Sequence, residues 1–247
     1  MRGRFRRPAV AVLLPGSGSD HVFVVSAFGF PLSALGIRLV APPPEPGGAV
    51  VSAMWHALDS AVEESGADGA GLLVGGISLG AHVAAGWAAG YPGHCAGLLL
   101  ALPAWLGPAD AAPAAGAARA SANAVRRDGL PRTLAAMRAA VPQRWLADEL
   151  DRAWRSYGDG LADALDAAAA SAAPTAAQLR RLTMPAGIAA LADDPLHPRA
   201  VAERWRRALP SAAVVTTSLD AVGRDRATLG RATVLAWLRA ASTPVPR

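Results

Sequence analysis

Short apolar runs alternate with helical patterns along this chain. The apolar runs have the length of buried strands and lie at 10–14, 37–40, 70–74, 96–102, 185–192 and 212–216. Between them, apolar residues recur at helical spacing, and helices are expected at 50–62, 81–89, 201–209 and about 224–240. Strands separated by helices pair in parallel through right-handed crossovers. The pattern therefore predicts an α/β fold: a doubly wound, mainly parallel sheet of about six strands with helices on both faces.

One long interval breaks this rhythm. Between residues 108 and 182 there is no strand-like run, and apolar residues at a 4-3-4 spacing predict helices over 130–141 and 146–157. Ala109–Ala118 is low in complexity and is expected to be mobile. The sequence thus predicts a helical cap insertion, and the expected organisation is a basic tail at 1–7, a core at 8–107 and 183–247, and a cap at 108–182.

The net charge of +5 gives little reason to expect a nucleic-acid partner. Four of these charges come from arginines in the first seven residues, so the rest of the chain carries only about +1. No stripe of basic and aromatic residues is present. The apolar stretch after the basic start, residues 9–14, is too short for a secretory or membrane-spanning segment. We therefore expect a cytoplasmic protein with no nucleic-acid or membrane partner.

Metal and nucleotide sites find no support in the sequence. The five histidines and the single cysteine, Cys95, show no metal-ligand spacing, and one cysteine cannot form an internal disulfide. Cys95 opens an apolar run, so a buried, unreactive thiol is expected. Gly16-x-Gly18 lacks the third glycine of a dinucleotide loop, and the absence of lysine excludes a phosphate-binding loop with Lys-Ser/Thr. No cofactor or metal is predicted.

The motif Gly76-Ile77-Ser78-Leu79-Gly80 carries the clearest chemistry. It follows a predicted buried strand and precedes a predicted helix, which is the context of a nucleophile elbow. A serine on so sharp a turn needs hydrogen atoms in place of side chains at both flanking positions, and Gly76 and Gly80 supply them. The following helix would point free amide groups at the same spot, where they suit a developing negative charge.

With this elbow, the chain resembles an α/β-hydrolase over roughly residues 8–240. Two further stretches carry the resemblance: Pro15-Gly16-Ser17-Gly18 after the first strand, and Asp193-Asp194-Pro195-Leu196-His197 after the fifth. The resemblance implies that Ser78 is the nucleophile and that Asp194, directly before a proline, is the triad acid. It also implies an oxyanion hole formed by the Leu79 N–H and by the N–H of Gly16 or Ser17.

The histidine of the family is missing from its usual place. It should follow the last strand, yet no histidine occurs after His197, so the triad is incomplete by sequence. His21, after the presumed oxyanion loop, and His197, in the loop of the acid, are the candidate general bases. His82, one helical turn past Ser78, is expected to have a packing role.

Two functions remain open. The first is a small serine hydrolase that cleaves a carboxylic ester or related acyl bond of a small-molecule substrate through a Ser78 acyl-enzyme. Trp105, Trp145 and Trp154 are candidates to line its apolar pocket. The second is a binding protein that has kept the fold and lost the base. The missing histidine motivates this alternative, because a serine hydroxyl is a poor nucleophile without a neighbouring base.

Overall fold

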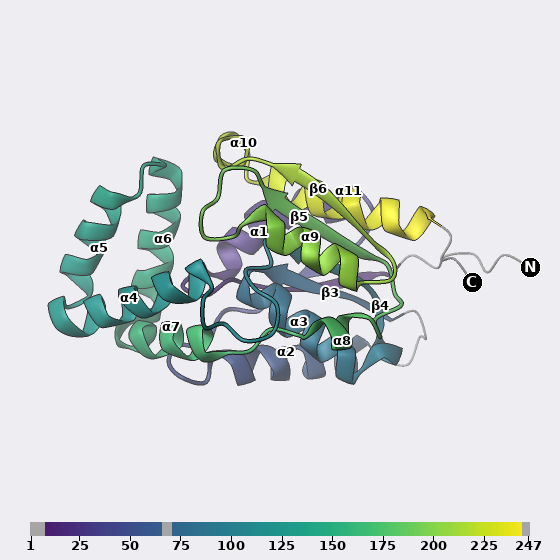
Figure 1. The fold of residues 1–247 in the computed structure, drawn as a ribbon, viewed down its shortest axis with the longest axis horizontal. Helices are drawn as coiled ribbons and strands as arrows, with labels where there is room; N and C mark the ends of the chain where they lie inside the picture. The colour runs from purple at the N-terminus through teal and green to yellow at the C-terminus, as the bar shows by residue number, and fades with distance from the viewer. Residues whose placement is uncertain (1–7, 66–70, 244–247) are drawn as a thin grey trace, which may run out of the picture.

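A parallel sheet forms the centre of this computed structural model, which describes residues 8–65 and 71–243. Its strands are β1 (Val10–Leu14), β2 (Arg38–Val40), β3 (Leu72–Ile77), β4 (Cys95–Ala101), β5 (Ala186–Leu191) and β6 (Ala212–Thr217). They lie in the order β2-β1-β3-β4-β5-β6, and every neighbouring pair is parallel (Figure 1). The predicted fold class is confirmed, and so is the prediction of about six strands.

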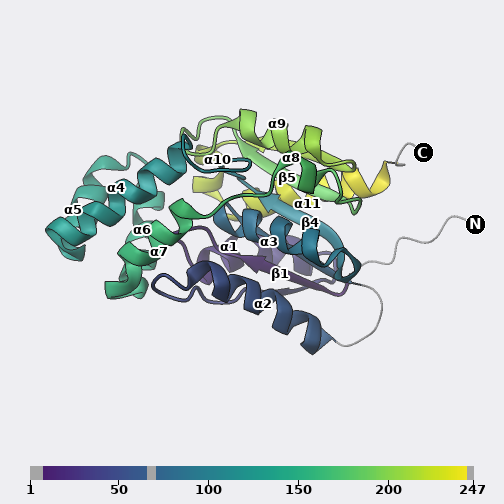
Figure 2. The same cartoon turned by 60° about the horizontal axis from the view of Figure 1, so that its bottom comes forward.

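Helices cover both faces of the sheet (Figures 1 and 2). Those packed on the sheet are α1 (His21–Ser33) and α11 (Ala227–Ser242) on one face, and α2 (Val50–Ser65), α3 (Leu79–Gly90) and α9 (Arg199–Ala208) on the other. Side chains alternate along the strands between these two layers, so Leu13 packs with the first group and Val12 with the second. Burial on both faces explains why the central strands β1, β3, β4 and β5 are continuously apolar, whereas the edge strands β2 and β6 are only partly buried.

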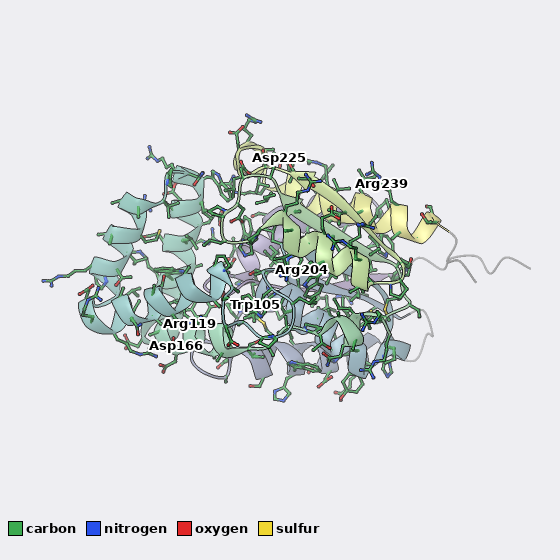
Figure 3. The ribbon with its side chains drawn as sticks, in the orientation of Figure 1. Trp105, Arg119, Asp166, Arg204, Asp225 and Arg239 are labelled. Carbon is green, nitrogen blue, oxygen red and sulfur yellow. The ribbon has the colours of Figure 1, made fainter. Side chains whose placement is uncertain are left out.

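A set of helices separates β4 from β5. It consists of α4 (Pro113–Asp128), α5 (Leu130–Ala140), α6 (Arg144–Tyr157), α7 (Leu161–Ala170) and the short α8 (Ala176–Leu179). Figures 1 and 2 show α4–α7 grouped beyond the end of the sheet where the strands finish. Arg119 of α4, which is labelled in Figure 3, donates to the carbonyl of Ala169 in α7 over 3.2 Å. Arg126 of α4 forms ion pairs with Asp163 and Asp166.

One local prediction was wrong. The stretch 109–118, expected to be mobile, contributes the first turns of α4 from Pro113 onwards. Proline is preorganised for the first helical position, and alanine has the highest helix propensity, so low complexity here does not mean disorder. The helix expected at about 224–240 is confirmed as α11 (Ala227–Ser242). A short helix that was not expected, α10 (Leu219–Arg224), precedes it, and Asp225 Oδ1, between the two, accepts a hydrogen bond from the Ala227 N–H.

The remaining elements are single turns: the 3₁₀ helices η1 (Pro92–His94) and η2 (Gly158–Gly160). The basic tail at 1–7 and the predicted strand start at residue 70 lie outside the described residues. None of the helices in residues 8–65 and 71–243 is long and apolar enough to span a bilayer.

Candidate active site

Ser78 stands on the sharp turn between β3 and α3. Its backbone has φ 53° and ψ −111°, and its N–H donates to the carbonyl of Ala101 on β4 over 2.9 Å. A Cβ on Gly76 or Gly80 would overlap the carbonyl oxygen of Leu14 on β1. Both glycines of the motif are therefore required by close backbone packing, as the sequence indicated. The backbone strain at Ser78 is of the kind found at functional sites.

A hydrogen-bonded chain leads away from the Ser78 hydroxyl. His197 Nε2 lies 3.0 Å from Ser78 Oγ, and His197 Nδ1 lies 2.7 Å from Asp194 Oδ2. Ser78 is 8% exposed, and the side chains of His197 and Asp194 are 17% and 9% exposed. The structure thus brings Ser78, His197 and Asp194 together, although the last two are only three residues apart in sequence.

The charge of Asp194 determines which nitrogen of the His197 ring carries a proton. Burial alone would raise the pKa of Asp194, but hydrogen bonds from the His197 ring and from the N–H groups of Leu196 and His197 outweigh burial, so its pKa is lowered. An ionised carboxylate can only accept, so His197 Nδ1 carries a proton. In the neutral ring, Nε2 is then free to accept the Ser78 hydroxyl proton.

The neighbouring Asp193 has a different partner. Its Oδ1 accepts a hydrogen bond from the N–H of Leu219, at the start of α10, over 2.7 Å. This bond ties the loop after β5 to the loop after β6, where the sequence lacks the expected histidine. The sequence did not predict the hydrogen bond from Leu219 to Asp193, because two adjacent aspartates give no indication of which carboxylate faces which loop.

The loop after β1 lies against the serine. A Cβ built on Gly16 would lie 3.4 Å from the carbonyl oxygen of Ile77 and 3.5 Å from Ser78 Cβ, so the backbone of this loop approaches the elbow closely. Leu79 is the first residue of α3, and its N–H has no acceptor within the helix. The predicted donors, Leu79 and either Gly16 or Ser17, therefore come from two segments that flank Ser78.

Solved structures similar to this chain share its architecture. A thermophilic esterase from Thermogutta terrifontis superposes with a TM-score of 0.73 at 21% identity, over 95% of this chain and 90% of the esterase. The enol-lactonase from Burkholderia xenovorans LB400 gives a TM-score of 0.68 at 16% identity, over 96% and 93%. A hydrolase from Pseudomonas aeruginosa PA01 gives 0.65 at 21%, over 94% and 90%. The protein has an α/β-hydrolase fold.

Comparison of sequences gives no evidence for this fold. No family model matches the chain, and no curated protein matches it in sequence.

His82 and His21 take no part in the hydrogen bonds that link Ser78, His197 and Asp194. His82, predicted to pack, is 2% exposed, and its Nε2 accepts the N–H of Ala104 over 2.9 Å. Burial, and secondarily the charge of His197, lowers its pKa to about 3. His21, the other candidate base, has a buried Nδ1 without a partner and forms no hydrogen bond to Ser78 among the described residues. Of the two candidate bases, only His197 is within reach of the serine.

The tryptophans predicted to line a pocket pack in different ways. Trp105, which is labelled in Figure 3, is 5% exposed. It meets the His82 ring edge-on, with 4.4 Å between centroids. Trp154 is 6% exposed and lies against Gly18 in the loop after β1. Trp145 lies under the Arg226 guanidinium, 4.3 Å from the ring centre to Cζ. Trp105 and Trp154 are thus the two that approach the elements around Ser78.

A second strained residue accompanies the elbow. Among the described non-glycine residues, only Ser78 and Leu102 have positive φ, and Leu102 directly follows β4, the strand next to β3. Strain at two adjacent strand ends marks this edge of the sheet as the place where function is expected. Sequence reasoning missed Leu102, since leucine gives no signal of a left-handed backbone.

Metal-binding groups and the single cysteine were the other candidates for chemistry. The described residues contain no group of three or more histidine, cysteine or acidic side chains arranged to hold a metal ion. Cys95 is buried, as predicted, and burial raises the pKa of its thiol to about 12.

Proposed function

We propose that this protein is a serine hydrolase that cleaves a carboxylic ester or a related acyl bond through a covalent acyl-enzyme on Ser78. One observation carries the proposal: the hydrogen-bonded chain from Ser78 Oγ through His197 to Asp194, with distances of 3.0 and 2.7 Å. A nucleophile, a base within reach of it and a third group orienting that base are the recognised signature of such chemistry.

The proposed reaction has two halves. Ser78 Oγ attacks the substrate carbonyl while His197 Nε2 takes the hydroxyl proton, and Asp194 stabilises the imidazolium. The carbonyl oxygen becomes an oxyanion held by the Leu79 N–H and by the N–H of Ser17 or Gly16. His197 then gives its proton to the leaving alcohol. Water attacks the acyl-enzyme with the same base, which releases the acid and restores Ser78.

Two independent observations support ester-type substrates. Two of the similar structures are an esterase from Thermogutta terrifontis and an enol-lactonase from Burkholderia xenovorans LB400. The buried rings of Trp105 and Trp154 also lie beside elements that carry the site, Trp105 against His82 and Trp154 against Gly18. We therefore propose a small-molecule substrate with an apolar portion near these rings.

The alternative, a binding protein without a base, rests on the missing histidine after β6. The position of His197 favours the hydrolase, because a base from the preceding loop occupies the place opposite Ser78. The two functions differ in one property, which is the reactivity of the Ser78 hydroxyl.

The deciding experiment is labelling with a fluorophosphonate probe, with hydrolysis of a p-nitrophenyl ester measured in parallel. The wild type is expected to be labelled at Ser78, and Ser78→Ala is expected to lose both labelling and turnover. His197→Ala should slow turnover by about 10²-fold or more, the size expected for loss of a general base. His21→Ala is the matched control and should stay within about twofold of the wild type.

Thermal unfolding of each variant separates loss of reactivity from loss of fold. A folded wild type that is neither labelled nor active would remove the hydrolase and favour the binding protein. Labelling that survives His197→Ala but not His21→Ala would assign the base to His21 instead.

A further inference from the structure

Helix α6 holds the loop after β1 at three consecutive residues. The indole of Trp154 lies against Gly18 and leaves no room there for a Cβ. Gly18 also has a φ of 63°, a backbone conformation that residues with side chains rarely adopt. The Tyr157 hydroxyl donates to the carbonyl of Ser19 over 3.0 Å. Arg152 donates twice to Asp20, from Nη2 to Oδ1 over 2.7 Å and from Nε to Oδ2 over 3.1 Å. Three side chains of α6 therefore contact residues 18, 19 and 20 and together fix the path of this loop.

The Asp20 carboxylate is the centre of this contact. It is only 4% exposed, and its Oδ1 also caps α1 by accepting the Phe23 N–H over 3.0 Å. A buried carboxylate without a cation is costly, so Arg152 is needed for this conformation of the loop. Arg152 also pairs with Glu149 on its own helix. The two-point contact with Asp20 fixes direction as well as distance, which a single point charge would not do.

The loop that α6 holds is the loop that flanks Ser78. Gly16 at its start touches the elbow, and the Ser19 N–H donates back to the Gly16 carbonyl over 3.1 Å, so residues 16–19 form one tight turn. Ser17, a candidate oxyanion donor, lies inside that turn. Its N–H therefore keeps its direction only while both ends of the turn are fixed.

We propose that Asp20 and Arg152 are positioning residues, through which the helical insertion sets the direction of the oxyanion-hole amide at Ser17. The inference rests on the proposed hydrolase function and deepens it. In this view α6 is more than a cover over the site, because its side chains determine how well the developing negative charge is bound. Neither residue touches the reacting atoms.

The alternative role for the contact is plain attachment of the insertion to the core. The two roles predict different kinetics. Loss of oxyanion stabilisation lowers kcat and leaves KM nearly unchanged, because the interaction exists only in the transition state. Loosening of a cover would instead weaken substrate binding and raise KM.

The test compares Arg152→Met with Arg155→Met on a p-nitrophenyl ester. Arg155 lies on the same helix and forms a two-point contact of the same kind with Asp151, over 2.8 and 3.1 Å, but at the exposed surface. We expect Arg152→Met to lower kcat about tenfold with KM within about twofold, since full removal of an oxyanion donor costs about 10²–10³-fold. Arg155→Met should match the wild type.

Two further measurements complete the test. Arg152→Lys should recover only part of kcat, because lysine restores the charge without the two-point geometry. Amide hydrogen exchange in the peptide covering residues 15–20 should rise in Arg152→Met and stay unchanged in Arg155→Met. If Arg152→Met does not fold, Tyr157→Phe removes only the bond to Ser19 and should lower kcat in the same direction by a smaller factor.

The outcomes distinguish the inference from the function beneath it. An active wild type whose kcat is unchanged in Arg152→Met, or whose KM alone rises, overturns the positioning role and leaves the hydrolase intact. A wild type that is neither labelled nor active overturns the hydrolase, and the positioning role with it.

Discussion

At the scale of the residue, two histidines next to the same serine differ because of their surroundings. His197 is partly exposed and faces a carboxylate, which suits it to carry a proton in the proposed reaction. His82 is enclosed between Trp105 and Trp205, and its Nε2 accepts from the backbone N–H groups of Ala104 and Trp105. Its burial, and secondarily the charge of His197, lowers its pKa to about 3. Burial of His82 in the folded protein therefore favours its neutral form.

This neutrality predicts how stability depends on pH. The unfolded chain protonates His82 at its ordinary pKa of 6.5, whereas the folded protein resists protonation down to about 3. The free energy of unfolding contributed by His82 is therefore complete above 6.5 and declines as the pH falls toward 3. The loss at pH 5 should be about 2 kcal/mol, measured by urea unfolding at pH 8 and pH 5.

The control is His82→Gln, which keeps an acceptor for the Ala104 N–H and cannot titrate. The variant should lose less stability than the wild type between pH 8 and pH 5. Equal losses in the two proteins would contradict a depressed pKa at His82.

At the scale of the element, α3 is placed by a glycine at its start. Gly80 lies so close to β1 that a Cβ there would overlap the carbonyl of Leu14 and approach that of Pro15 within 2.7 Å. Gly86, on the same helix, has its nearest neighbour, the Trp55 ring, at 3.5 Å, an ordinary contact. Both glycines lie on α3, but only Gly80 is required by close packing of the backbone.

Alanine substitution should separate them. Gly80→Ala forces backbone apart in the core and should lower the free energy of unfolding by about 3 kcal/mol. Gly86→Ala should be neutral or stabilising by up to about 1 kcal/mol, because alanine is the better helix former. Urea unfolding of both variants measures this, and equal stabilities would show that the β1–α3 approach is looser than described.

At the scale of the whole molecule, α11 fastens one face of the sheet through small residues on the strands. A Cβ on Gly187 of β5 would overlap the backbone of α11 at Thr233 and Trp237. The Trp237 side chain is fully buried against Gly97 of β4. Tryptophan on the helix and glycine on the strands thus fit together, and the helix lies closer to the sheet than larger strand residues would permit.

This close fit predicts a large cavity penalty. Trp237→Ala should lower the free energy of unfolding by about 3–5 kcal/mol, or prevent folding. Leu235→Ala, on the same helix but 43% exposed, should change it by less than about 0.5 kcal/mol. Thermal and urea unfolding compare the two, and a small effect at Trp237 would contradict its role in fastening α11.

Much of the fold could be predicted because its signals are local. The six apolar runs match the six strands within a few residues. The signal is strongest for the four central strands, since a strand buried on both faces must be apolar along its length. The errors fell where local signals compete. Low complexity predicts a mobile stretch before residue 118, whereas Pro113 and the alanines after it favour the helix that the structure shows. The short helix α10 is absent from the prediction, because six residues give little periodic signal and its start depends on the Ser218 cap.

The sequence by itself determined the sheet, the elbow and the identity of Ser78 as the residue displayed on it. These follow from periodicity and from glycine spacing, and both act over a few residues. Only the tertiary structure decided that His197 faces Ser78, that Asp193 and Asp194 turn to different partners, and that Arg152 reaches Asp20 across 132 positions of chain. Such contacts depend on which loops lie next to each other at the edge of the sheet. The spacing of residues within one segment does not specify this arrangement.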